Sequence, residues 1–168
     1  VDPTGQTVVY WHQFSSAQGA TIDALIAQFN ETNEYGITVT GIPQGSYNDI
    51  RELMNAAIVS GELPNLVAGY ANDAGSYARD GAAADMSAYL NDATYGLSAD
   101  ELAAFNTALL DFNTVDGALL AWPHQASAQV MVANQTLLTE LGYDAPPATL
   151  DEFRAVACAS AESTGPNG

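Results

Sequence analysis

The chain has 168 residues, 48% of them hydrophobic, and its 20 acidic side chains face only 3 basic ones, for a formal net charge of -17. Because all three cations are arginines, a P-loop and a lysine Schiff base are both excluded. A surface this acidic also repels nucleic acids and anionic membranes. These properties predict one strongly solvated globular domain without a nucleic-acid partner.

The sequence contains no recognisable targeting segment and a single cysteine. No apolar run approaches the roughly 18 residues needed to cross a bilayer, and the stretch from Val1 to Gly5 lacks the pattern of a signal peptide. We therefore expect a soluble chain whose export signal has been removed. Whether a lipid anchor precedes Val1 stays an open question. Cys158 is the single cysteine, which excludes an internal disulfide, and its apolar helical surroundings predict a small buried side chain.

The first half of the chain alternates strand and helix signals. Short apolar or alternating runs predict strands at 6–11, 37–42 and 65–70. Helical spacing follows each run: Ile22, Leu25, Ile26 and Phe29, then a helix capped by Ser46, then a short helix capped by Asn72 or Asp73. This β-α alternation predicts a mostly parallel sheet flanked by helices, in which ligands bind outside the C-terminal strand ends.

The elements predicted from Ser98 onward are a helix, a hairpin and two further helices. Ser98 and the apolar positions from Leu102 to Phe112 predict the longest helix of the first half of the fold. Asp116-Gly117 predicts a hairpin, and residues 129–133 form a further apolar, strand-like stretch. A helix over 134–142 and a last helix capped by Thr149, with Glu152 completing a capping box, follow.

The order of these segments resembles family 1 of the extracellular solute-binding proteins, which includes the maltodextrin and glycerol-phosphate binders of ABC importers. The resemblance covers residues 6–160. The segments that carry it are YWHQF, AQFNETNEYGITVT, GSYNDI, AAIVSGELPNLVAGY, VDGALLAWPHQASAQVMVANQTLL and LGYDAPPATLDEF.

The resemblance implies an α/β fold, a periplasmic-binding-protein-like (type II) lobe, with the second lobe largely missing. On that comparison residues 1–134 form the N-terminal lobe up to a hinge strand near 130–134, and residues 135–168 begin the second lobe. Members of the family close two lobes around a ligand. With half of the cleft absent, we expect the chain to bind at least about tenfold more weakly than a two-lobed protein, or about 1.4 kcal/mol.

Aromatic and polar residues follow the predicted strands and hairpin, the mixture that stacks on polyol ligands and bonds their hydroxyls. By resemblance, Tyr47 and Ser127 line the cleft. Packing roles for Trp11, Tyr47 and Tyr70, and capping roles for Asn72 and Asp73, are the alternatives. The ligand-binding candidates are Trp11, His12, Gln13, Tyr47, Tyr70, Asn72, Asp73, His124, Gln125 and Ser127.

The ligand expected from this set is a sugar or another neutral polyol. In the glycerol-phosphate-like branch a carboxylate often follows the tyrosine of the third strand, where this chain has Ala71. Helix starts near Ser15 and Ser46 are candidate phosphate sites, but the many carboxylates work against an anionic ligand.

No cofactor and no metal are predicted, because His12 and His124 lack a third ligand at a recognisable spacing and are expected to bond at a cleft or the surface. The predicted function is a monomeric, extracytoplasmic solute-binding component of an ABC importer, without catalytic residues, that partners a membrane permease. A carbohydrate-active hydrolase with paired carboxylates and a non-catalytic carbohydrate-binding domain are the alternatives.

Overall fold

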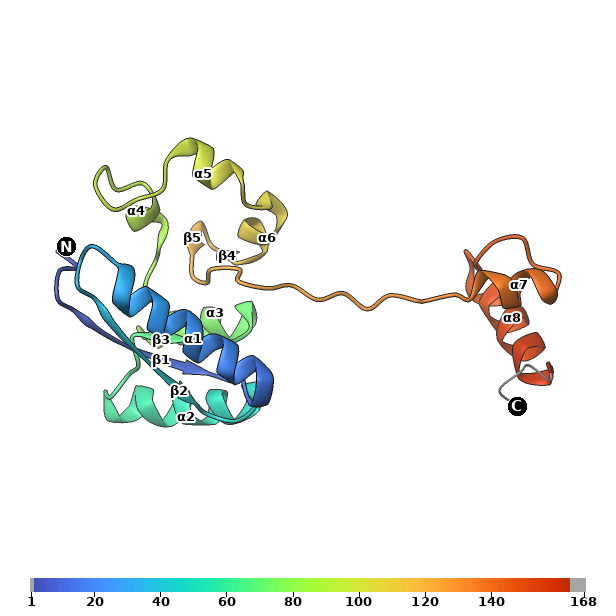
Figure 1. Ribbon diagram of the computed structural model, residues 1–168, viewed down its shortest axis with the longest axis horizontal. Coiled ribbons are helices and arrows are strands. Elements are labelled where there is room, and N and C mark those ends of the chain that lie inside the picture. The colour runs from blue at the N-terminus through green and yellow to red at the C-terminus, as the bar shows by residue number, and fades with distance from the viewer. Residues whose placement is uncertain (1, 164–168) are drawn as a thin grey trace. The chain divides into compact units, whose positions relative to one another are not determined.

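The computed structural model describes residues 2–163 (Figure 1). The chain divides into two compact units, Val1–Ala126 and Ser127–Gly168, each of which is described by itself. The division falls ahead of the predicted lobe boundary at residue 134, and the interpretation of 130–134 as a hinge strand stays a prediction.

A three-stranded parallel sheet forms the centre of the first unit. Strand β1 (Thr7–His12) lies between β2 (Thr38–Pro43) and β3 (Leu66–Val67). In register, Thr7 faces Thr38 at one end of the β1–β2 pair and His12 faces Pro43 at the other. The predicted α/β architecture with a parallel sheet is confirmed. Strand β3 is shorter than the predicted strand at 65–70. The Ala68 N–H still bonds to the Trp11 carbonyl at 2.8 Å, but beyond Ala68 the chain turns into the next helix.

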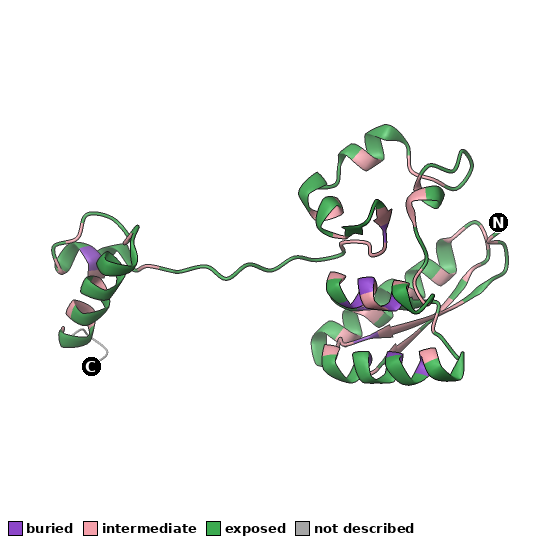
Figure 2. Cartoon of the chain, turned by 180° about the vertical axis from the view of Figure 1, so that it is seen from behind, coloured by how far each residue is buried: buried purple, intermediate pink, exposed green. Residues whose placement is uncertain are grey.

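Helix α2 (Tyr47–Ser60) supplies most of the apolar core. It begins with a capping box between Ser46 and Asp49 and ends at Gly61, whose left-handed φ of 79° favours glycine. Its residues Ile50, Met54 and Ala57 are among the few buried positions of the chain (Figure 2). Tyr77 of α3 (Ala71–Arg79) joins Ile50 and Met54, and Trp11 and Val67 of the sheet pack against them.

Helix α1 (Ser16–Thr32) lies along β2, and it has no buried residue. Figure 1 shows α1 and α2 on opposite sides of the strands. The alternation of side chains along β1 explains the difference in contacts, since Trp11 packs on the α2 side whereas His12 lies beside Gly41 and Ile26 of α1. The side chain of Asn30 joins α1 to β2, accepting from the Val39 N–H at 2.7 Å and donating to its carbonyl at 2.9 Å.

Helix α3 begins earlier than predicted. Tyr70 occupies the cap position without a side-chain hydrogen bond, so that Asn72 and Asp73 lie inside the first turn and the capping roles considered for them are wrong. The early end of β3 explains this shift, because the helix starts as soon as the strand has left the sheet. Asp73 is thereby turned inward, with 7% of its surface exposed.

Three short helices and a hairpin complete the first unit: α4 (Ser87–Leu90), α5 (Ala99–Ala103), α6 (Thr107–Phe112), β4 (Thr114–Val115) and β5 (Ala118–Leu119). The long helix predicted after Ser98 is wrong, because Asn106 accepts from the Ala108 N–H and starts a new helix. The longest helix is α1, with 17 residues. The hairpin is confirmed, with Asp116 and Gly117 both at positive φ.

The second unit contains α7 (Gln135–Glu140) and α8 (Leu150–Glu162). Among its described residues, 127–163, Leu138 is buried, and the Tyr143 N–H bonds to the Leu138 carbonyl at 2.8 Å. The strand expected at 129–133 does not form: Val130 and Val132 are 77% and 90% exposed, with no neighbouring strand. Cys158 is exposed on α8, so its predicted burial is wrong. Among residues 2–163, no helix is both long and apolar enough to cross a membrane.

Candidate functional site

The C-terminal ends of the three parallel strands bring most of the predicted binding residues to one edge of the sheet. His12 ends β1, Tyr47 begins the helix after β2, and Tyr70 precedes the helix after β3. Because parallel strands all point the same way, these positions meet at one edge, where open α/β sheets bind ligands. The loop after β5, which carries His124 and Gln125, also reaches this edge, as its contacts below show.

Tyr47 and Tyr70 form an aromatic pair at this edge. Their ring centroids lie 4.6 Å apart at an angle of 42°, and Tyr70 is 54% exposed. The amide of Gln125 donates to the Tyr47 hydroxyl at 3.1 Å, although the two residues are far apart in sequence. Burial raises the pKa of Tyr47, the hydrogen bond from Gln125 opposes the rise, and Tyr70 adds to it, so the phenol stays neutral at physiological pH.

A second aromatic group extends along the α1 side of β1. The His12 ring lies 5.2 Å from the Tyr10 ring and 5.8 Å from the Phe14 ring. Phe14 in turn meets His124 edge to face at 6.2 Å. Burial raises the pKa of Tyr10, and neighbouring Tyr47 raises it further, so the two aromatic groups are close enough to interact electrostatically.

Sequence reasoning missed Tyr10 and Phe14. A signal for both was available, because in an extended segment residues two positions either side of His12 share its face. Tyr10 lies within β1, ahead of the strand-end positions from which the candidates were chosen, whereas Phe14 follows the strand and was not chosen.

His12 is buried, with 1% of its surface exposed, so the expectation of a cleft or surface hydrogen-bonder is wrong for this residue. Among the described residues, neither of its ring nitrogens nor Oε1 of Gln13 has a hydrogen-bond partner. Gly41 permits this placement, since a Cβ there would lie 3.1 Å from the His12 Nε2. A buried polar atom without a hydrogen-bond partner lowers the stability of the folded protein. The end of β1 therefore carries polar atoms that have hydrogen-bonding capacity left over.

Trp11 and Asp73 are in contact with other residues of the fold. Trp11 packs against the core cluster around Ile50, and Asp73 is buried with its Oδ1 accepting from the Asn72 amide at 3.2 Å. Burial raises the pKa of Tyr77 and the nearby Asp73 raises it further. Binding roles for Trp11, Asn72 and Asp73 stay predictions. So does the role of Ser127, an exposed residue of the second unit.

The start of α2 is already occupied by a carboxylate of the chain itself. Asp49 Oδ2 accepts from the Ser46 N–H at 2.6 Å and from its hydroxyl at 2.7 Å, and these bonds lower the pKa of Asp49. This capping box weakens the case for Ser46 as a candidate phosphate site, and that role stays a prediction. Helix α1 differs, having no acidic residue in its first turn and no side-chain cap bond from Ser15.

The arrangement suits binding to a neutral solute. Within residues 2–163, no group of three or more histidine, cysteine or acidic side chains is close enough to hold a metal ion. The groups gathered at the edge are phenols, imidazoles and amides, which stack on apolar faces and exchange hydrogen bonds.

Residues 24–165 match the family of bacterial extracellular solute-binding proteins. Among curated proteins, the sn-glycerol-3-phosphate-binding periplasmic protein of Agrobacterium fabrum is 26% identical over 150 residues. That alignment covers 86% of this chain and 33% of the relative, so the chain spans about a third of the relative's length.

Solved structures that share the fold include two sugar-binding proteins. The cyclic alpha-maltosyl-1,6-maltose binding protein from Arthrobacter globiformis matches with a TM-score of 0.65 and 25% identity, over 95% of this chain and 39% of that one. The maltotriose binding protein of Thermus thermophilus matches with a TM-score of 0.56 and 18% identity, over 94% and 38%.

Proposed function

Because the chain belongs to the family of bacterial extracellular solute-binding proteins, we propose that it supplies one wall of the binding cleft of an ABC importer's solute receptor. The ligand is a neutral sugar or polyol, held at the C-terminal strand ends and delivered to a membrane permease from outside the cytoplasm. The protein binds and releases its ligand without chemistry.

The observation that carries this proposal is the Tyr47–Tyr70 pair with Gln125 beside it. A pyranose has apolar C–H faces that stack on aromatic rings and hydroxyls that need amide or phenol partners. The Tyr70 ring is half-exposed, so it offers a free surface, and the Tyr47 hydroxyl and the Gln125 amide hold each other in place. An edge organised before binding loses less entropy when the ligand arrives.

The charges at this edge favour a neutral ligand over an anionic one. Asp49, whose pKa is lowered by its hydrogen bonds to Ser46, lies in the first turn of the helix that Tyr47 begins, and it is therefore ionised at neutral pH. The net charge of -17 adds a general repulsion of anions.

Two lines of comparison support a sugar-like or polyol-like solute. The two solved structures described above are oligosaccharide-binding proteins, and the curated relative binds a glycerol phosphate. In those longer proteins much of the chain lies beyond the part matched here. We infer that the opposite wall of the cleft is formed by a second lobe, of which residues 135–168 are the beginning, and that hinge closure brings it over the tyrosine pair.

Calorimetric titration of the chain with maltose, glycerol and sn-glycerol 3-phosphate tests the proposal. We expect maltose to bind and Tyr70→Ala to weaken it about threefold to tenfold, from the loss of one aromatic contact. Phe112→Ala is the matched control, because Phe112 is 74% exposed and lies on α6. Unchanged affinity in Tyr70→Ala would refute the site.

The same titrations separate the alternatives. Tighter binding of sn-glycerol 3-phosphate than of maltose would show that the ligand is anionic, not neutral. The phosphate would then be expected at the start of α1, which has no side-chain cap bond and no acidic residue in its first turn. Release of glucose from maltose would favour the hydrolase. Loss of sugar uptake in cells lacking the gene, restored by the wild-type gene, is expected if the protein serves an importer.

A further inference from the structure

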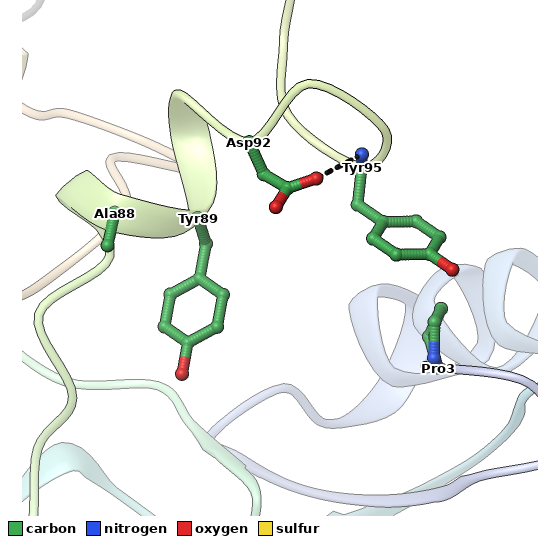
Figure 3. Close-up of a pocket in the computed structure, with 5 residues that line it drawn as sticks. All are labelled: Pro3, Ala88, Tyr89, Asp92 and Tyr95. Atoms are coloured by element: carbon green, nitrogen blue, oxygen red, sulfur yellow. Dashed lines mark hydrogen bonds between the residues drawn. The ribbon is translucent and has the colours of Figure 1, made fainter. Parts of the chain in front are cut away.

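A hollow of about 330 Å³ lies away from the candidate site, lined by Pro3, Ala88, Tyr89, Asp92 and Tyr95 (Figure 3). Tyr89 belongs to α4, and Asp92 and Tyr95 to the turn that follows it. Pro3 precedes β1, so the hollow lies toward the N-terminal ends of the strands. The tyrosine pair of the candidate site lies at the C-terminal ends, which makes this a separate place on the molecule.

Aromatic rings form the walls of this hollow. Tyr89 and Tyr95 are 56% and 45% exposed, and Figure 3 shows both rings reaching into the space below Asp92. The Tyr35 ring contacts the Tyr95 ring edge to face, with centroids 5.7 Å apart. Two exposed tyrosines that share one hollow offer negatively polarised π faces to a ligand.

The Asp92 carboxylate stands between the two rings. Its Oδ1 accepts from the Thr94 N–H at 2.8 Å and from the Tyr95 N–H at 2.9 Å. These backbone bonds, that from Tyr95 first, lower the pKa of Asp92, so the group is ionised at neutral pH. Figure 3 shows the other carboxylate oxygen pointing toward the space between Tyr89 and Tyr95. Glu34 is the main cause of a raised pKa at Tyr35, the residue whose ring contacts Tyr95.

We propose that this hollow binds a small organic cation of the quaternary ammonium class. Cations are attracted to tyrosine faces, and methyl groups on the cation contact the rings without needing hydrogen bonds. The fixed carboxylate of Asp92 supplies the counter-charge, and the net charge of -17 raises the concentration of cations at the surface. A neutral sugar would leave this ionised carboxylate uncompensated, which is why the charge favours a cation.

The site is shallow, so the affinity is modest. Exposed cation-π contacts are weak, and we expect half-saturation with choline on the order of millimolar. The inference does not depend on what the strand-end site binds, and Tyr70→Ala is expected to leave choline binding unchanged.

The test is a titration of the chain with choline chloride, followed by the amide signals of residues 88–95 in nuclear magnetic resonance spectra, against sodium chloride at equal ionic strength. Asp92→Asn keeps an oxygen that can accept the two backbone bonds while removing the charge, and we expect choline binding to weaken at least about fivefold. Asp100→Asn is the control, because it changes the net charge equally at an exposed residue of α5.

A second pair of variants guards against a disturbed turn at Asp92. Tyr89→Leu removes one ring and is expected to weaken choline binding, whereas Phe112→Leu leaves it unchanged. Equal weakening in Asp92→Asn and Asp100→Asn would overturn the proposal, because binding would then reflect net charge alone. Equal signal changes with sodium chloride, or saturable changes at residues 88–95 with maltose in place of choline, would also overturn it.

Discussion

The two helices that flank the sheet are attached to it by different means. Helix α2 buries Ile50, Met54 and Ala57, is capped by Ser46 and ends at a left-handed glycine. Helix α1 is longer, yet it buries no residue, and Leu25 and Phe29 of its apolar stripe are 55% and 42% exposed. Its attachment includes a pair of side-chain hydrogen bonds from Asn30 to the backbone of β2.

This contrast shows that an amphipathic pattern predicts a helix more reliably than it predicts burial. Three strands offer too little surface to cover the apolar stripe of α1. On the other side, Trp11, Val67 and Tyr77 supply a closed apolar surface for α2. We therefore expect the α2 face to supply most of the stability of the first unit, and polar contacts to matter more for α1.

The largest effect is expected from Ile50→Ala. Ile50 is 1% exposed at the centre of the core cluster, and truncating a fully buried isoleucine costs about 2–4 kcal/mol. Urea unfolding measures the loss. Leu53→Ala on the same helix is the control, since Leu53 is 39% exposed and should cost clearly less. Equal losses in the two variants would show that α2 is not the anchored helix.

An intermediate effect is expected from Asn30→Ala. The substitution leaves the N–H and the carbonyl of Val39 without their partner, at a cost of about 1–2 kcal/mol in the same unfolding experiment. Gln28→Ala is the matched control, because Gln28 is exposed on α1. If Asn30→Ala proves as mild as Gln28→Ala, polar attachment of α1 is wrong.

The smallest effect is expected from Ser46→Ala, which removes the N-cap of α2 and costs about 1 kcal/mol. Ser15→Ala provides the comparison at α1, where the serine makes no side-chain cap bond, and should change stability little. A larger loss for Ser15→Ala than for Ser46→Ala would reverse the contrast between the helices.

The Ser46 effect should also depend on pH. Its hydrogen bonds lower the pKa of Asp49 in the folded protein from the ordinary value of 3.8. A lowered folded-state pKa contributes stability above the unfolded value, and that contribution is lost as the pH falls through the folded value. The stability difference between wild type and Ser46→Ala should therefore narrow below about pH 4. If this stability difference stays constant down to pH 2, the Asp49 carboxylate does not contribute to the effect of the Ser46 side chain.

Sequence signals predicted structure well where that structure depends only on residues close together in the sequence. The capping boxes at Ser46 and Thr149 and the turn at Asp116-Gly117 form as expected, because each needs only residues a few positions apart. The helix expected from 98 to 112 fails for the same local reason, since the Asn106 side chain competes for a backbone N–H and restarts the helix.

The candidate site was predicted in part. Tyr47, Tyr70 and Gln125 were chosen from their positions after strands or the hairpin, and in the structure Tyr47 contacts both Tyr70 and Gln125. Burial could not be predicted in the same way. His12 is buried under the aromatic edge because Gly41 of the neighbouring strand leaves space for its ring, and only the pairing of β1 with β2 creates that neighbour.

The sequence by itself determined the parallel α/β order, the acidic surface and the strand-end positions of the binding candidates, because periodicity, charge and turn chemistry are local properties of the chain. Only the tertiary structure decided which helix is anchored by apolar burial, that the loop at Gln125 meets Tyr47, and that Tyr89, Asp92 and Tyr95 share a hollow. Those outcomes depend on which distant segments pack together, and packing is a property of the folded chain as a whole.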